Sequence, residues 1–153
     1  MKLLVLLLSL KLLLFSTELK VIADAFNADE AKGISEFSGH VKITKGNDEL
    51  NASKVTIYID KERHPVKYEA EGQLSFFIMT DSNATYRGHA QKGVFLPDEE
   101  SYSFYGNVRL YQLDQKKTII GDKVIVNMKK GTAAAEGGHK KPVIMTFELE
   151  EKQ

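Results

Sequence analysis

Residues 36–58, EFSGHVKITKGNDELNASKVTIY, decide the fold of this chain. They contain two runs of alternating apolar and polar residues, separated by a polar turn at Lys45–Glu49. In the first run, Phe37, Val41 and Ile43 fall at odd positions. Successive side chains of a strand point to opposite faces, so each run predicts a strand with one apolar and one polar face. The stretch therefore predicts a pair of neighbouring strands.

The same pattern recurs later in the chain. Residues 104–110 (FYGNVRL) echo residues 37–43 (FSGHVKI), and residues 120–126 (IGDKVIV) loosely echo residues 50–57 (LNASKVTI). A recurrence of this kind indicates a chain built from a strand–turn–strand unit that is used at least twice.

Further short alternating runs fill the rest of the sequence. We expect strands at residues 19–26, 67–71, 73–79, 85–95, 102–112, 118–128 and 143–149. The second and third are separated at Gly72, and in the 118–128 strand Ile120, Val124 and Val126 share a face. Turn clusters rich in Gly, Asp, Asn and Pro lie between the runs, and helical periodicity is absent after the first residues. This pattern predicts an all-β fold, either an antiparallel sandwich, a jelly roll or a barrel.

The N-terminus predicts secretion. Residues 1–16, MKLLVLLLSLKLLLFS, place a basic residue before a leucine run, which is the layout of a signal peptide. The apolar run is too short to span a membrane, and Lys11 interrupts it. We expect a signal peptide at residues 1–17 and a single domain at residues 18–153. A short membrane anchor that stays attached is the alternative.

Composition and motifs exclude several kinds of chemistry. The 21 basic and 21 acidic residues cancel, so charge gives no case for binding nucleic acid or an anionic membrane. The chain has no cysteine, and its four histidines lack zinc-binding spacing. One of them, His40, is expected to be a solvated residue on the polar face of its strand. Asn83-Ala-Thr85 matches the glycosylation acceptor pattern, which is a short and weak signal. We therefore expect no enzyme, no catalytic residue, no metal and no cofactor.

The apolar face is the positive signal. It carries four large side chains, Phe37, Phe76, Phe95 and Phe104. The residues of such a face usually pack in the hydrophobic core and bind no ligand. In a secreted chain with no helix to cover the sheet, however, a large apolar interior either packs shut or holds a hydrophobic guest such as an acyl chain.

Five segments, taken in order, resemble the signature segments of the LptA/OstA-like family of periplasmic lipopolysaccharide-transport proteins. They are FSGHVKITKG at 37–46, LNASKV at 50–55, YRGHA at 86–90, YGNV at 105–108 and IGDKV at 120–124. Each is weak alone, whereas five in order are fairly specific, and the resemblance runs from about Leu19 to the end. Two residues depart from the family pattern. Ser53 stands where relatives have an acidic residue, and Pro97 falls where they continue a strand.

The resemblance implies a twisted antiparallel β-jelly roll that is open at both ends and has a hydrophobic interior. Such proteins bind the acyl chains of lipid A inside and leave the sugars of lipopolysaccharide outside. They stack head to tail through their terminal strands and bridge the inner-membrane and outer-membrane components of the transport machinery. Burial of acyl chains is favourable by roughly 0.8 kcal/mol per methylene. Unpaired terminal strands suit assembly by strand addition.

Strand parity gives a set of residues that we expect to face the lipid. They are Leu19, Val21, Phe37, Val41, Ile43, Ile57, Phe76, Ile78, Phe95, Phe104, Val108, Leu110, Val124 and Val126. Two alternatives remain open: the membrane-anchored sister subunit of the same pathway, and a periplasmic β-domain with a closed core that binds a protein or a glycan. An enzyme ranks last.

Overall fold

The computed structural model of the chain describes residues 18–151, which form ten β-strands and no helix. Accordingly, no helix in this range is long and apolar enough to cross a membrane. The strands are β1 (Leu19–Ile22), β2 (Ala25–Asp29), β3 (Ile34–Lys45), β4 (Asp48–Ile59), β5 (Pro65–Met79), β6 (Thr85–Leu96), β7 (Ser101–Gln112), β8 (Lys117–Asn127), β9 (Thr132–Glu136) and β10 (Ile144–Phe147). The signal peptide expected at residues 1–17 lies outside the described residues.

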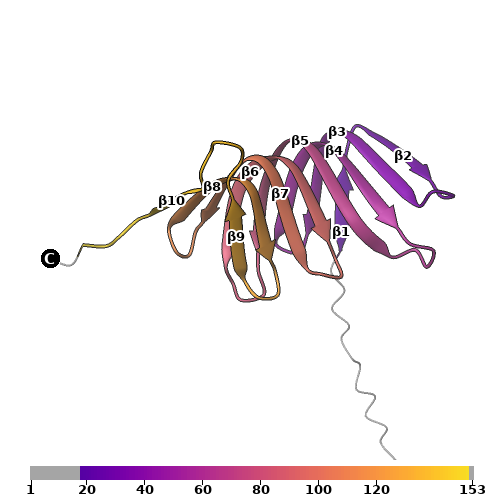
Figure 1. Cartoon of the computed structure of the whole chain (residues 1–153). Coiled ribbons are helices and arrows are strands. Elements are labelled where there is room, and N and C mark those ends of the chain that lie inside the picture. The colour runs from indigo at the N-terminus through magenta and orange to yellow at the C-terminus, as the bar shows by residue number, and fades with distance from the viewer. Residues whose placement is uncertain (1–17, 152–153) are drawn as a thin grey trace, which may run out of the picture.

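The strands form one antiparallel sheet in which sequence neighbours pair. The order is β1-β3-β4-β5-β6-β7-β8-β10, with β2 also paired to β3 and β9 also paired to β8. In Figure 1 the strands follow one another along the long axis, from β2 at one end to β10 at the other. The two ends of the sheet are therefore each made of two short strands laid along one long strand.

Each odd-numbered long strand bends at a glycine followed by a polar residue. The pairs are Gly39–His40, Gly72–Gln73 and Gly106–Asn107, and all six residues have positive φ, between 46° and 83°. The register shifts at the same places, because two residues of the bent strand oppose one residue of the next strand. This is the arrangement of a β-bulge, which bends the strand and increases its twist. The three pairs are called the corners below.

The corners change the alternation of side chains in a regular way. In odd strands the inward positions step by four residues across the corner, as from Phe104 to Val108. In even strands they step by three, as from Ala52 to Val55. Parity is therefore kept in odd strands and reversed in even ones.

Three expectations are corrected here. The predicted break at Gly72 is wrong, because β5 runs through it as one strand. The expectation that Ile120 shares a face with Val124 is also wrong, since Ile119 is buried and the parity of β8 reverses between Gly121 and Val124. The strand expected at residues 19–26 is split at Ala23–Asp24 into β1 and β2.

The bends fold the sheet over itself into two layers. Tyr102 of β7 donates a hydrogen bond to Asp48 of β4 over 2.9 Å, although three strand spacings separate these strands in the sheet order. Neighbouring strands lie about 4.8 Å apart, so a flat sheet would hold these strands about 14 Å apart. The first layer holds residues 25–29, 34–38, 54–59, 65–71, 92–96, 101–105, 123–127 and 132–136. The second holds residues 19–22, 41–45, 48–52, 74–79, 85–90, 108–112, 117–121 and 144–147.

The hydrophobic core lies between the two layers. The buried residues with the least exposure come from both layers, among them Val55, Phe104 and Val124 from the first and Val41 and Leu110 from the second. The expected all-β, twisted antiparallel jelly roll is confirmed in this arrangement, which places one apolar core between the layers.

Candidate functional site

An apolar pocket opens between the layers in the N-terminal half of the fold. Its wall comes from β1 and from β3 to β7, and includes Ile43, Leu50, Val55, Ala70 and Phe104. We call it the inner pocket. Its free volume is about 50 Å³. A cavity of about 150 Å³ accommodates benzene, so the inner pocket is too small for an acyl chain unless the layers move apart.

The structure places all fourteen residues expected to face lipid at or near the space between the layers. Nine are buried in the core: Val41, Ile57, Phe76, Ile78, Phe104, Val108, Leu110, Val124 and Val126. Four are half-buried and pack against it: Val21, Phe37, Ile43 and Phe95. Leu19 is 37% exposed at the end of the sheet and contacts the inner pocket. Only Leu19, Ile43, Ile78, Phe95 and Phe104 line the inner pocket itself.

Parity reasoning missed other pocket residues. Leu50 and Val55 both line the pocket although their positions differ by an odd number, because Ser53, which lies opposite the corner of β3, reverses the parity of β4 between them. Tyr68, Ala70 and Gly93 also line it, and a period of two through each half-strand would have found the first two. Gly93 carries no side chain and so gives no hydrophobic signal. A side chain there would meet Leu74 and Phe104.

The mouth of the inner pocket is closed by polar and aromatic contacts, of which the Tyr102–Asp48 hydrogen bond and the approach of Lys45 to Phe95 join the layers. The hydroxyl of Tyr102 donates to Asp48 Oδ2, and the backbone N–H of Met79 donates to Asp48 Oδ1 over 2.9 Å. The ring of Phe95 stacks on that of Tyr102 with centroids 4.4 Å apart, and Lys45 Nζ lies 5.4 Å from the Phe95 centroid. Burial raises the pKa of the Asp48 carboxyl and the pKa of the Tyr102 hydroxyl. The hydrogen bond thus joins two groups that are largely withdrawn from water.

A second, polar pocket lies on the outer side of this mouth. We call it the outer pocket. It has a free volume of about 510 Å³. Its wall includes amides, hydroxyls and carboxylates, among them Asn47, Thr80, Asp81, Asn83 and Glu100. Four residues, Lys45, Asp48, Phe95 and Tyr102, line both pockets and therefore form the wall between them.

Deeper in the fold, two phenylalanine rings join the layers. Phe76 of the second layer stacks on Phe104 of the first, with ring centroids 3.8 Å apart and an angle of 6° between planes. The ring of Phe76 also lies against Gly88, where a side chain would meet it at 2.7 Å. Beyond the stack, Val108, Leu110 and Val126 are fully buried. The interior is therefore open on one side of the Phe76–Phe104 stack and packed on the other.

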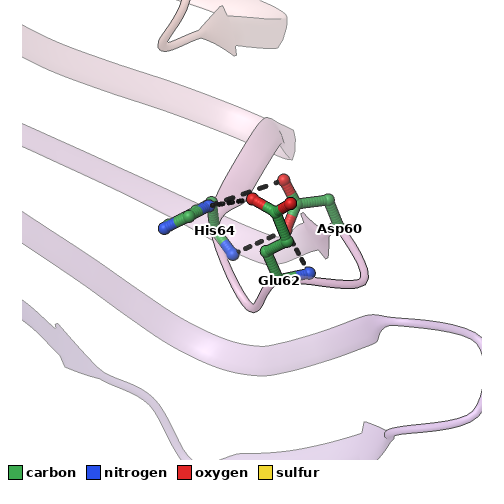
Figure 2. Close-up of polar contacts among 3 residues, drawn as sticks. All are labelled: Asp60, Glu62 and His64. Atoms are coloured by element: carbon green, nitrogen blue, oxygen red, sulfur yellow. Dashed lines mark hydrogen bonds and ion pairs between the residues drawn. The ribbon is translucent and has the colours of Figure 1, made fainter.

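The turn between β4 and β5 brings two carboxylates and an imidazole together. His64 Nδ1 lies 3.7 Å from Asp60 Oδ2 and 3.6 Å from Glu62 Oε2, as Figure 2 shows. These are atoms that could ligate a cation. All three residues are exposed, and Asp60 Oδ1 accepts the backbone N–H groups of Glu62 and His64. The arrangement accounts for the shape of the turn, because the Asp60 carboxylate satisfies the backbone donors inside it.

His40 is exposed, as expected for the polar face, but it has a partner. Its Nδ1 lies 2.7 Å from Asp24 Oδ2, and this hydrogen bond and the negative charge of Asp24 raise the pKa of His40 above its ordinary value. Asp24 stands beside the Gly39 corner, as Ser53 stands beside Gly72 and Gln91 beside Gly106. Ser53, the departure from the family pattern, donates a hydrogen bond to the carbonyl of Gly72 over 3.2 Å.

A comparison with curated protein sequences finds no match. One solved structure that matches is LptH from Pseudomonas aeruginosa, described as the LptA homologous periplasmic component of the lipopolysaccharide transport device. It is 15% identical, with a TM-score of 0.75, and the match covers 86% of this chain and 96% of LptH, which shows a shared fold.

A family model provides the sequence relationship. Residues 20–132 match the family described as LptA/(LptD N-terminal domain) LPS transport protein. This range spans all but the ends of the described sheet, including the three corners and the inner pocket residues after Leu19. The resemblance seen in the five sequence segments is confirmed. The chain belongs to the LptA/LptD N-terminal domain family of lipopolysaccharide transport proteins.

Proposed function

We propose that this protein is a periplasmic carrier that shields the acyl chains of lipid A between its two layers during lipopolysaccharide transport. The observation that carries the proposal is the apolar inner pocket, which lies between layers joined by side-chain contacts at its mouth. The family membership supports the same reading. Secretion through the signal peptide predicted at residues 1–17 would deliver the protein to the periplasm.

Binding must involve separation of the layers, because the free volume of the inner pocket is about 50 Å³. Separation exposes apolar side chains, and an acyl chain that fills the space covers them again. Each methylene withdrawn from water contributes roughly 0.8 kcal/mol. A chain of a dozen methylenes thus gains about 10 kcal/mol, which offsets the loss of packing between the layers. The protein performs no covalent reaction in this scheme, and the drive for transport comes from elsewhere.

The fourteen residues named from parity are proposed as the lipid-facing set. Leu19, Ile43, Ile78, Phe95 and Phe104 would make the first contacts, because they already line the inner pocket. The buried members, such as Val108 and Val124, would meet lipid only when the packed half opens.

The two ends of the sheet are proposed to join other proteins by strand pairing. At one end Ile22 of β1 and Phe26 of β2 are exposed, and at the other Ile144, Met145 and Phe147 of β10 are exposed. Exposed apolar side chains on short edge strands are typical of edges that pair with a further strand. Head-to-tail copies, and the inner-membrane and outer-membrane components at the two ends of the series, would continue the interior from one membrane to the other.

A second candidate is a β-domain with a closed core that binds a protein or a glycan. The small free volume and the complete burial of Val108, Leu110 and Val126 favour it. It differs from the carrier in one measurable respect, since no lipid would reach the interior.

Photo-crosslinking separates the two candidates. A photoreactive phenylalanine analogue replaces Phe95 in the inner pocket or Phe76 in the core, and Phe77 is the matched control. Phe76 and Phe77 are adjacent phenylalanines on opposite faces of β5, since Phe76 is 3% exposed and Phe77 lies outside near Arg87. The carrier predicts adducts with lipopolysaccharide at Phe95 and Phe76 and none at Phe77. Absence of adducts at both inner positions, in variants with the circular dichroism of the parent, would exclude the carrier and leave the closed-core domain.

A further inference from the structure

The two layers meet along one edge of the fold, and the contacts that join them at the wall between the inner and outer pockets differ from those further along this edge. At the wall, two side-chain contacts join the layers, the Tyr102–Asp48 hydrogen bond and the approach of Lys45 to Phe95, and the Phe95–Tyr102 stack connects them within the first layer. Further along, the backbone joins them, since the N–H of Asp81 donates to the carbonyl of Met128 over 3.1 Å. Side-chain contacts can open by rotation about χ angles, whereas the backbone link requires the turns themselves to move.

We propose that Lys45, Asp48, Phe95 and Tyr102 form a side gate through which acyl chains enter the inner pocket directly from the outer pocket. The inference rests on the proposed carrier function and adds the route and the orientation of the guest. The four residues are the ones shared by an apolar space and a polar one. An amphiphile that passes between them places its apolar chains inside and its head group outside without turning over.

The chemistry of the outer pocket indicates the head group that it accepts. Asn47, Thr80 and Asn83 offer amide and hydroxyl groups, and Asp81 and Glu100 offer carboxylates. These groups accept hydrogen bonds at many points, which suits a head group rich in hydroxyls. A saccharide bearing acyl chains fits this combination of pockets, whereas a free fatty acid would offer no hydroxyls to the outer pocket and would place its own carboxylate near those of Asp81 and Glu100.

The Tyr102–Asp48 hydrogen bond acts as the latch of this gate. Its acceptor is held in position by the second bond from the N–H of Met79, and its donor ring is held by the stack with Phe95. A hydrogen bond to a charged group is stronger than one between neutral groups. Loss of the latch should therefore speed entry of the guest and raise its affinity, because a guest with its chains inside and its head group outside holds the gate open and keeps the bond broken.

The test compares rates of uptake of lipid A that carries an environment-sensitive fluorophore. Tyr102→Phe keeps the ring and its stack but removes the latch, and Asp48→Asn removes the charge. Tyr105→Phe is the matched control, since Tyr105 lies three residues along the same strand on its outer side beside Lys123. We expect about a tenfold increase in the association rate and in the affinity for Tyr102→Phe and Asp48→Asn, and no change for Tyr105→Phe. Equal rates in all four proteins would overturn the gate.

A covalent link that holds the gate shut should slow the uptake of lipid A, whereas loss of the latch speeds it. The chain contains no cysteine, so Asp48→Cys with Tyr102→Cys can be joined by a bis-maleimide at that place alone. The control link joins Ser103→Cys to Ile125→Cys, which lie opposite each other in β7 and β8. We expect the gate link to slow uptake at least about tenfold relative to the control link. Uptake at the control rate would show that the guest enters through the ends of the sheet. A parent protein that takes up no lipid A at all would instead overturn the proposed carrier function.

Discussion

The N-terminal and C-terminal halves of the interior follow the same alternation of side chains and reach different degrees of closure. In the N-terminal half, Ile43 and Leu50 are only partly buried and line the inner pocket. In the C-terminal half, Val108, Val124 and Val126 show no exposure. The Phe76–Phe104 stack stands between the two halves. An apolar face therefore becomes a groove or a core according to how completely the facing layer covers it, and side-chain patterning alone does not decide which.

The largest loss of stability should come from removing the Phe76–Phe104 stack, which stands between the two halves. Phe104→Ala removes a ring that is fully buried and stacked on Phe76, and such a change costs about 3–5 kcal/mol. Ile43→Ala at the half-buried pocket edge should cost only about 1 kcal/mol, because much of that side chain is not withdrawn from water. Urea unfolding followed by circular dichroism gives both free energies of unfolding. Equal losses in the two variants would mean that the halves are packed alike.

The corners allow a test of whether the halves differ in backbone as well as in coverage. Gly39 and Gly106 have φ of 77° and 79°, and a side chain at each would meet Asp24 and Gln91 respectively. Alanine in this conformation costs of the order of 1–3 kcal/mol. Gly39→Ala and Gly106→Ala should therefore lose similar amounts of stability, measured in the same urea experiment, since the strain is set by the corner and not by the surrounding burial. If the losses of stability in the two variants differ by more than about 1.5 kcal/mol, the burial around a corner also affects the strain of its backbone.

The smallest expected effect concerns the charged pair at the first corner, which the third corner lacks. Asp24 raises the pKa of His40 at the first corner, whereas Asn107 and Gln91 at the third corner do not titrate near neutrality. A raised pKa in the folded state stabilises the protonated form. This contribution is complete below the pKa of unfolded His, near 6.5, and is lost as the pH rises through the pKa of the folded state. NMR titration should show His40 above its ordinary pKa and Asp24→Asn should return it to that value. An unchanged titration in Asp24→Asn would remove the charged link from this corner.

The strands and their apolar faces could be predicted because a period of two is visible within each half-strand. Phe37, Val41 and Ile43 keep that period through the corner of β3, so the inward face was assigned correctly there. Ile120 was misassigned because the even strands change parity opposite each corner, and Asp122, the residue that absorbs the shift, is polar and reads as an ordinary outward position. The split of the first strand at Asp24 has the same cause.

The contact between Asp48 and Tyr102 at the proposed side gate could not be predicted from the sequence. Asp48 and Tyr102 are 54 residues apart and become neighbours only when the corners fold the sheet over. Asp48 begins a strand directly after a two-residue loop and reads as a turn residue, while Tyr102 reads as one more aromatic residue in a strand. Their pairing depends on how far the two layers are offset by twist, and no local pattern records that offset.

The even distribution of the corners makes the length of the interior adjustable in fixed increments. The corner glycines are separated by 72 − 39 = 33 and 106 − 72 = 34 residues, and each interval comprises two strands. Because paired strands lie about 4.8 Å apart, one such interval adds about 10 Å of enclosed space. Insertion or removal of a whole interval would leave the remaining strands in antiparallel pairs, and each would keep the same residues facing inward. The length of the interior can thus change in steps of one pair of strands, each encoded by a gene segment of about 100 bases.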